Sequence, residues 1–394
     1  MKIQRSHKIR LCPNNRQANY FARACGVARF TYNWGLSEWR KQYEAGQKPN
    51  WYGLARQFNS TKKQKFPFVT EVTKYASARA FVNLSKAFQN FFRNVKAGRK
   101  PGYPRYKRKG IRNSFYLGND VVKFDDKYVR VPKLGWVKMR EALRFEGKVL
   151  SATISRIADM WFMAVRVEQE IVKPVPASPV LGVDVGIKNL AVVSDGRVFE
   201  NPKALKRAEA RLRMLQKSVS RKQKRSQNRK KAVLRLQKQH YRTSCIRRDA
   251  THKATTAITK GCSVLGIEDL NIRGMQKNRR LSKALSDASL SEFLRQIEYK
   301  AQQLGVVVVK ADKFYPSSKT CSSCGHVKTK LALSERTYKC ECCGLVLDRD
   351  LNAAVNLRNL AVGSTVSACC LGSSGSSSKS KTTDWAGISR KSAS

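Results

Sequence analysis

Four cysteines arranged in two short turns form the strongest metal-binding pattern in the sequence. Cys321-Ser-Ser-Cys324-Gly and Cys340-Glu-Cys-Cys343-Gly are C-x-x-C-G turns separated by 15 residues. Four thiolates at this spacing can surround one Zn²⁺ tetrahedrally. Cys342 leaves the pairing ambiguous by one residue, but the C-x-x-C-G pattern selects Cys340 and Cys343. We therefore predict a structural zinc site, with free or redox-active thiols as the alternative.

Three acidic residues far apart in the sequence could bind a second kind of metal. Asp184 lies inside an apolar run, Glu268 at the end of another, and Asp350 at the start of a helical pattern. An ionised Asp in an apolar strand is costly unless it is compensated, commonly by a divalent metal. If the three carboxylates converge, they can bind two Mg²⁺ or Mn²⁺ ions, which activate water for phosphodiester hydrolysis. A solvated Asp at a strand end is the alternative for Asp184.

The elements that carry these acids predict an α/β sheet. The pattern predicts an apolar hairpin at residues 179–196 and two further apolar strands at 262–270 and 305–309. A helix is predicted between these two strands, at 290–304. Alternation of buried strands and helices is typical of such a sheet. Asp350 is expected in the first turn of a closing helix, where Asn352 and two small alanines allow close approach to the strands. The cysteine turns lie between the last strand and Asp350, so we expect them to be an insertion.

The charge balance of the chain indicates a polyanionic partner. The 394 residues include 79 Lys and Arg against 27 Asp and Glu, a formal net charge of +52, and 41% are hydrophobic. A folded chain of this charge repels itself unless a polyanion neutralises it. A membrane surface is the rival, but the basic residues are spread over every segment and no apolar run approaches spanning length. We expect nucleic acid as the partner, and no membrane.

The start of the chain and its cysteines are typical of a cytoplasmic protein. No signal-peptide core follows Met1, so we expect a cytoplasmic protein of a prokaryote. In a reducing cytosol the 11 cysteines are thiols or metal ligands and form no disulfide frame.

Two segments concentrate the basic residues. Residues 98–113 combine Lys, Arg and Tyr with two prolines and three glycines, which predicts a loop that follows phosphates or stacks on bases. Residues 203–248 hold 18 Lys and Arg against the single Glu209, which predicts a phosphate-bound helical hairpin. The alternatives are a solvated linker and a solvated charged face. The candidate nucleic-acid contacts are Arg99, Lys100, Tyr103, Arg105, Tyr106 and Lys107 in the loop, Lys188 after the first strand turn, and Arg221, Lys222, Lys224, Arg225, Arg229 and Lys230 in the hairpin.

The first half of the chain predicts a small barrel with a helical insertion. A basic strand at 2–12 precedes three helical stretches, and from 114 to about 172 the pattern switches to the period of two that is typical of strands. The first strand could join that barrel. Prolines between 174 and 179 predict a linker to the second half. Residues 361–394 contain 11 serines and little apolar periodicity, which predicts a disordered tail.

Several motifs together resemble the TnpB proteins of insertion sequences, the compact relatives of type V CRISPR effectors. They are Gly-Val-Asp184-Val-Gly-Ile-Lys, Gly-Ile-Glu268-Asp-Leu, Pro316-Ser-Ser-Lys-Thr-Cys321, Asp348-Arg-Asp350-Leu-Asn-Ala-Ala, Arg10-Leu-Cys-Pro13 and Gly26-Val-Ala-Arg29-Phe-Thr-Tyr-Asn33-Trp. The resemblance covers roughly residues 1–360.

The resemblance implies an α+β multidomain fold. A wedge β-barrel would hold an inserted helical recognition lobe, followed by an RNase H-like RuvC α/β domain with an inserted zinc ribbon. The implied segments are 1–13 and 114–173 for the barrel, 14–113 for the lobe, 179–316 and 345–360 for the RuvC domain with a basic helical hairpin at 203–260, and 317–344 for the ribbon.

The resemblance also implies the activity. Such a protein would be an Mg-dependent RNA-guided DNA endonuclease that binds a transposon-encoded guide RNA and cuts double-stranded target DNA, with one strand displaced, beside a short adjacent motif. Asp184, Glu268 and Asp350 match the catalytic triad, with Asp184 bridging the metals and Glu268 orienting the attacking water. Asp348 is the weaker match, because Asp350 directly precedes Leu-Asn-Ala-Ala. We expect a monomer.

Two other functions stay open. A repressor could keep RNA-guided or direct DNA binding without cleavage, although the intact triad argues against it. A transposase could join DNA ends itself, although no Tyr nucleophile motif supports that chemistry.

Overall fold

The computed structural model describes residues 1–171, 179–332 and 334–370, of which 365–370 are described by their backbone alone. The chain divides into two compact units, residues 1–173 with 204–246 and residues 174–203 with 247–394. The predicted proline linker lies almost entirely outside the described residues. No helix of the described residues is long and apolar enough to cross a membrane.

The first unit is built on two antiparallel sheets. One has the strand order β1 (Lys2–Leu11), β7 (Met160–Glu170), β6 (Lys148–Ile157) and β2 (Ser114–Gly118), and the other has β3 (Lys123–Asp125), β4 (Tyr128–Val131) and β5 (Gly135–Lys138). β1 pairs with β7 along its whole length, so the first strand joins the sheet that follows the helices, as the sequence predicts. A bridge between Leu11 and Met139 links the two sheets.

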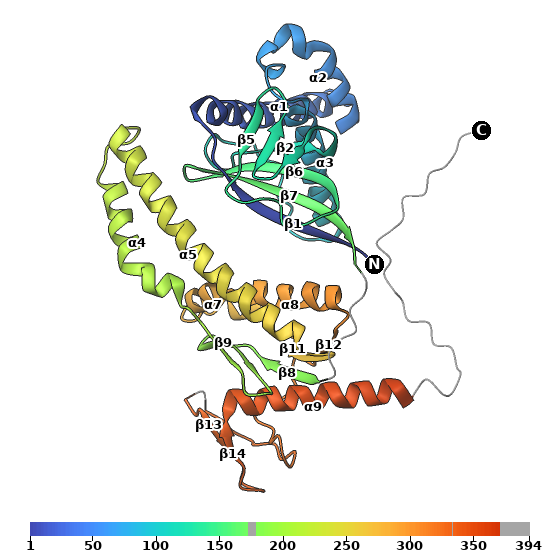
Figure 1. The fold of residues 1–394 in the computed structure, drawn as a ribbon, viewed down its shortest axis with the longest axis vertical. Helices are drawn as coiled ribbons and strands as arrows, with labels where there is room; N and C mark the ends of the chain where they lie inside the picture. The colour runs from blue at the N-terminus through green and yellow to red at the C-terminus, as the bar shows by residue number, and fades with distance from the viewer. Residues whose placement is uncertain (172–178, 333, 371–394) are drawn as a thin grey trace, which may run out of the picture. The chain divides into compact units, whose positions relative to one another are not determined.

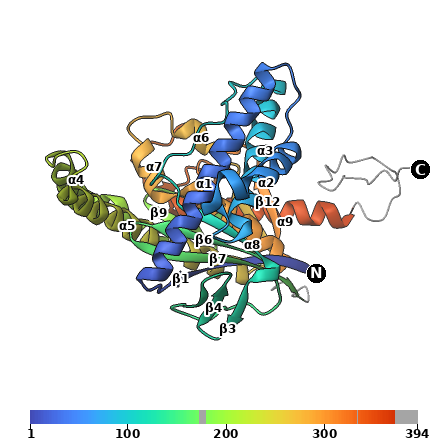
Figure 2. The same cartoon turned by 90° about the horizontal axis from the view of Figure 1, so that it is seen from above.

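Three helices are inserted between β1 and β2. They are α1 (Asn15–Glu44), α2 (Trp51–Lys65) and α3 (Lys74–Lys96), with short 3₁₀ turns at Pro67–Val69 and Asn119–Val121. α1 starts where Asn14 and Gln17 form a capping box directly after Pro13. α1 and α3 lie side by side (Figures 1 and 2). Phe81, Leu84 and Phe88 on α3 are buried, so most of its aromatic stripe is core.

The basic helical hairpin consists of α4 (Ala204–Ser220) and α5 (Gln227–Lys260). The break between the helices falls at residues 221–226, so the segment forms the predicted hairpin. The part of the hairpin up to residue 246 belongs to the first unit. Tyr241 on α5 packs on Phe162 of β7, with ring centroids 5.5 Å apart, and Lys238 forms an ion pair with Asp159 at 2.6 Å.

The second unit contains a mixed five-stranded sheet. Its order is β10 (Val198–Glu200), β9 (Asn189–Val193), β8 (Val180–Asp184), β11 (Val264–Glu268) and β12 (Val307–Ala311). β8, β11 and β12 are parallel, whereas β9 forms the predicted hairpin with β8. The short helices α6 (Ile272–Met275) and α7 (Ser282–Ala288) and the longer α8 (Leu290–Leu304) connect β11 to β12.

Helices cover both faces of this sheet. Leu181, Val183, Leu265 and Ile267 pack with α8 and the end of α5 in one core. On the other face α9 (Arg349–Cys370) lies against the strands (Figure 1). Gly182 and Gly266 allow this approach, because a Cβ atom would lie 2.0 Å from the Ala354 carbonyl oxygen and 2.2 Å from that of Leu357, respectively.

α9 corrects the predicted start of the tail. The helix continues to Cys370, so residues 361–370 are helical and the predicted boundary at 361 is too early. Ala361 is buried and extends the apolar face that begins with Ala353, Ala354 and Leu357, which the high serine content of the segment conceals. The rest of the predicted tail, residues 371–394, lies outside the described residues.

Candidate metal centres and nucleic-acid surface

Asp184 and Glu268 lie at the carboxyl ends of two neighbouring parallel strands. Gly182 is in register with Gly266, so the two acids, each two residues further on, follow at the same level. Side chains alternate between the faces of a strand. Because both glycines face α9, both carboxylates also belong to the α9 face of the sheet.

Asp350 brings the third carboxylate to this edge. It lies in the first turn of α9, as the sequence predicts, and is partly buried. Asp348 has a different task, because its Oδ1 accepts the backbone N–H groups of Asp350 at 2.9 Å and Leu351 at 3.1 Å. It therefore caps the helix. This engagement favours Asp350 over Asp348 as the third potential ligand.

The electrostatics of Asp184 report this gathering of negative charge. Burial, followed by the charges of Glu268, Asp350 and Asp348, raises the pKa of Asp184 to about 8, against the opposing effect of Arg349. Carboxylates that share a buried site resist ionising together unless a cation is present. Hard oxygen donors in this arrangement fit Mg²⁺ or Mn²⁺.

The cysteines form a tighter group than the carboxylates. The ligating atoms of Cys321, Cys324, Cys340 and Cys343 lie within 4.8 Å of one another, and in the described part of the chain no other group of three or more potential ligands does so. The sulfur atoms of Cys321 and Cys343 are 3.6 Å apart, as are those of Cys324 and Cys340. Backbone hydrogen bonds from Cys343 and Cys342 lower the pKa of the Cys340 thiol to about 6.

The local structure around the cysteines explains their spacing. Gly325 and Gly344 adopt φ angles of +76° and +72°, which the left-handed turn after each cysteine pair requires. β13 (Thr337–Lys339) and β14 (Val346–Asp348) pair beside the cluster, and Tyr338 fills its small core. Cys342 is exposed and outside the cluster. The cluster fits a structural zinc ion.

The predicted basic loop has no helix or strand and is held against the helices. Lys107 exchanges two backbone hydrogen bonds with the Asn33 side chain, at 2.8 and 3.0 Å. The Arg40 guanidinium lies 5.1 Å from the ring centroids of both Tyr103 and Tyr106. Both tyrosines remain exposed, as do the other predicted contacts of the loop, Arg99, Lys100, Arg105 and Lys107. An anchored loop with exposed rings and cations does not behave as a free linker.

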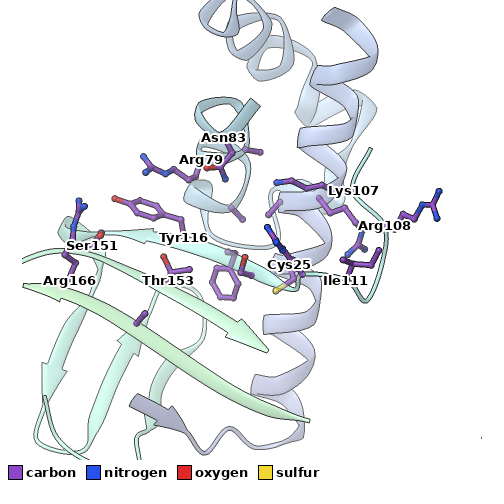
Figure 3. A pocket seen from close by; sticks show the side chains of 18 of the residues that line it. Cys25, Arg79, Asn83, Lys107, Arg108, Ile111, Tyr116, Ser151, Thr153 and Arg166 are labelled. Carbon is purple, nitrogen blue, oxygen red and sulfur yellow. The ribbon is translucent and has the colours of Figure 1, made fainter. Parts of the chain in front are cut away.

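A cavity of about 670 Å³ opens beside this loop in the first unit (Figure 3). Its lining contains six basic residues, Arg29, Arg79, Lys107, Arg108, Arg112 and Arg166, and no carboxylate among the described residues. Tyr116 faces the cavity below Arg79, whose guanidinium lies 4.6 Å from the ring centroid (Figure 3). Arg79, Asn83 and Arg166 also line the cavity but are not among the nucleic-acid contacts that the sequence predicts. Arg79 and Asn83 lie one turn apart on α3, but only the packing of α3 on the sheet reveals that they share the cavity.

The remaining predicted contacts differ in their availability. Lys188 is exposed at the turn after β8, and Arg221, Lys224, Arg225 and Lys230 are exposed near the break between α4 and α5, where Lys222 is half-buried. Arg229 is also half-buried, and its guanidinium donates to the carbonyl oxygens of Val219 at 2.8 Å and Lys222 at 3.3 Å. Through its Nη1 atom it closes the turn between the helices.

Known proteins resemble this chain along most of its length. It is 33% identical over 383 residues to a candidate RNA-guided DNA endonuclease of Streptomyces pristinaespiralis, covering 93% of this chain and 91% of the relative. It is 31% identical over 392 residues to the candidate RNA-guided DNA endonuclease InsQ of Escherichia coli K12, covering 94% of each. The chain belongs to the TnpB family.

Family models cover the segments that carry the predicted site residues. One described as "Probable transposase" matches residues 163–279, which include Asp184 and Glu268, and a Cas12f1-like TNB domain matches 291–357, which include Asp350 and the cysteines. A helix-turn-helix domain matches residues 1–48, which in the structure form strand β1 and the long helix α1.

A solved structure of a Cas12f1 effector in complex with guide RNA and target DNA has a similar fold. The two match with a TM-score of 0.56 and 16% identity, covering 88% of this chain and 83% of that one. This likeness and the family models show an α+β multidomain fold for the TnpB-family chain.

Proposed function

We propose that this chain is an RNA-guided DNA endonuclease that hydrolyses target DNA beside a short adjacent motif. The observation that carries the proposal is the meeting of Asp184, Glu268 and Asp350 at one edge of the sheet, where burial and the neighbouring negative charges raise the pKa of Asp184. The relatives named as RNA-guided DNA endonucleases support it. The basic cavity and loop supply the surface for nucleic acid.

The proposed architecture follows from the sheets. The mixed sheet with helices on both faces would be an RNase H-like RuvC domain, formed by residues 179–203, 247–316 and 345–370 and interrupted by a zinc ribbon at 317–344. The two linked antiparallel sheets would be the wedge barrel, formed by residues 1–13 and 114–173, with the helical lobe at 14–113 inserted.

The three carboxylates would hold two divalent ions. When bound, Mg²⁺ or Mn²⁺ ions supply a water nucleophile and stabilise the leaving oxygen of the phosphodiester. The residues provide the frame: Asp184 and Glu268 are fixed by the strand register, and Asp350 by the cap that Asp348 gives to α9. The aligned strand ends and the capped helix set the backbone positions from which the three carboxylates project.

The basic surface would hold the guide RNA and its duplex with the target strand. Arg29, Arg79, Arg108, Arg112 and Arg166 concentrate positive charge around the cavity without an opposing acid in its lining. Exposed Tyr103 and Tyr106 offer ring faces to unpaired bases. Because the protein would contribute charge and shape while base pairing selects the sequence, binding should weaken steeply with salt.

The test is guided cleavage. The gene is expressed with its downstream flank, the copurified RNA is sequenced, and the complex is incubated with Mg²⁺ and a plasmid library randomised beside a guide-matched target. We expect guide-dependent cutting in the wild type and a loss of roughly 10⁴-fold in Asp184→Ala, as for groups essential to chemistry. RNA-guided binding without cutting would contradict the nuclease function and favour a repressor. Joined DNA ends in a strand-transfer assay would favour a transposase.

A further inference from the structure

The segment between β12 and the cysteine cluster reaches back to the carboxylate edge. It begins after Ala311, which is in register with Glu268 on the neighbouring strand. Ser317 in this segment is 2% exposed, and its hydroxyl donates a hydrogen bond to Glu268 Oε1 at 2.5 Å. A serine hydroxyl has one proton, so this bond fixes one carboxylate oxygen and leaves Oε2 for other partners.

Two asparagines on α9 hold this segment in place. Asn356 Nδ2 donates to the carbonyl oxygens of Ser317 and Thr320, each at 2.7 Å. One helical turn earlier, Asn352 Nδ2 donates to the Thr320 carbonyl at 2.7 Å, and Asn352 Oδ1 accepts the Ser322 N–H at 3.0 Å. Both asparagines are buried. The segment is therefore held against α9, which carries Asp350 in its first turn.

The same segment leads directly into the cysteine cluster. Cys321 follows Thr320, and its backbone N–H donates to the His326 carbonyl at 2.8 Å within the first cysteine turn. The contacts thus run from the cluster through residues 316–322 to Glu268, with α9 as a common support. Groups that hydrogen-bond a metal-binding carboxylate orient it, and their removal typically costs about 10–100-fold in metal affinity or activity.

We propose that Ser317 is a positioning residue that orients Glu268 for divalent metal binding, and that residues 316–322 couple the cysteine cluster to the carboxylate site. This inference rests on the proposed function, since it assigns the metal to the same three carboxylates. In this role Ser317 acts on the metal through Glu268, to which its hydroxyl is bonded. Removing its hydroxyl frees Glu268 to leave the geometry that the strand register and α9 otherwise favour.

The test measures Mn²⁺ binding to the guide RNA–protein complex from the electron paramagnetic resonance signal of free Mn²⁺. The Asp184→Ala complex supplies the background from ions bound to RNA. We expect Ser317→Ala to weaken the Asp184-dependent binding about 10–100-fold and to raise the Mn²⁺ concentration that half-saturates cleavage by a similar factor. Ser317→Thr, which keeps the hydroxyl, should restore binding.

Ser318→Ala is the matched control, because Ser318 is the adjacent serine and half-buried. It should leave Mn²⁺ binding unchanged. Unaltered Mn²⁺ affinity in Ser317→Ala would overturn the proposal, as would a loss of affinity accompanied by lost zinc and a lower melting temperature. A wild-type complex that binds Mn²⁺ through Asp184 but cuts no matched DNA would contradict the proposed nuclease function and not the role of Ser317. The Mn²⁺ affinities of the two serine variants would still decide that role.

Discussion

The two candidate metal centres of this chain are assembled in opposite ways. The four cysteines lie within residues 321–343 and come together through two glycine turns. The three carboxylates are each more than 80 residues from the next, and they meet only because two strands are in register and α9 packs on both. A centre made by local turns depends on its metal for order, whereas a centre made by long-range packing depends on the fold.

The sharpest way to test this contrast is to remove the zinc. Cys321→Ser should lose the ion and the order of the ribbon, because structural zinc contributes on the order of 10 kcal/mol to small domains of this kind. The sheet should persist, since its core contains none of the cluster cysteines. Through residues 316–322, cleavage should fall about 10–100-fold without being abolished. Zinc content by atomic emission and the single-turnover cleavage rate measure the two effects.

Cys342→Ser is the control for this prediction. Cys342 is exposed beside the cluster but is not one of the four grouped thiols. The variant should keep its zinc and its cleavage rate. Full cleavage by a zinc-free Cys321→Ser protein would show that the two centres are independent.

The same contrast explains what the sequence could predict. The cysteine spacing predicts the cluster, and the apolar runs that carry Asp184 and Glu268 predict the two strands β8 and β11 that hold these acids. The contact of Ser317 with Glu268 depends on residues 49 positions apart, and no local pattern encodes it. The lining of the basic cavity could not be predicted from the sequence for the same reason.

Arg229 shows a limit of composition. It belongs to a basic run, and its type and exposed neighbours predict a phosphate contact, while the structure adds that its Nη1 atom closes a turn inside the chain. Composition gives the charge of a segment, and it cannot say which cation is already paired with a carbonyl oxygen. The end of α9 is a similar case, because serine content concealed an apolar face that continues to Ala361.

The long-range centre can be tested at the glycines that let α9 approach the sheet. Gly182→Ala would put a Cβ atom 2.0 Å from the Ala354 carbonyl oxygen, so α9 must shift away from β8. We expect a loss of about 1–3 kcal/mol in the free energy of unfolding, as for overpacked cores. Because Asp350 lies in the first turn of α9, a shift of the helix should displace its carboxylate and lower the cleavage rate. The zinc content should stay normal. Chemical denaturation and the cleavage rate provide the measurements.

Gly363→Ala is the matched control on the same helix. A Cβ atom there meets nothing within 4 Å, and replacing a helical glycine by alanine stabilises a helix by up to about 1 kcal/mol. The two substitutions should therefore change stability in opposite directions. An unchanged stability in Gly182→Ala would mean that α9 does not pack on β8 as closely as the structure has it.

The smallest expected effects separate two neighbouring cations of the basic hairpin. Arg229→Ala should lower the stability of the turn by about 1 kcal/mol, because the carbonyl oxygens of Val219 and Lys222 lose a charged donor that is only partly shielded from water. Its effect on RNA affinity should be indirect and should leave the salt dependence of binding unchanged.

Lys230 is exposed, so Lys230→Ala should keep the stability of the wild type. If Lys230 contacts a phosphate, this variant lowers the slope of log affinity against log salt by about 0.7–1. Thermal unfolding and filter binding of the guide RNA at several salt concentrations distinguish the two residues. A reduced salt slope in Arg229→Ala with an unaltered melting temperature would return Arg229 to the phosphate-binding surface and show that its bonds to the turn are not maintained with RNA bound.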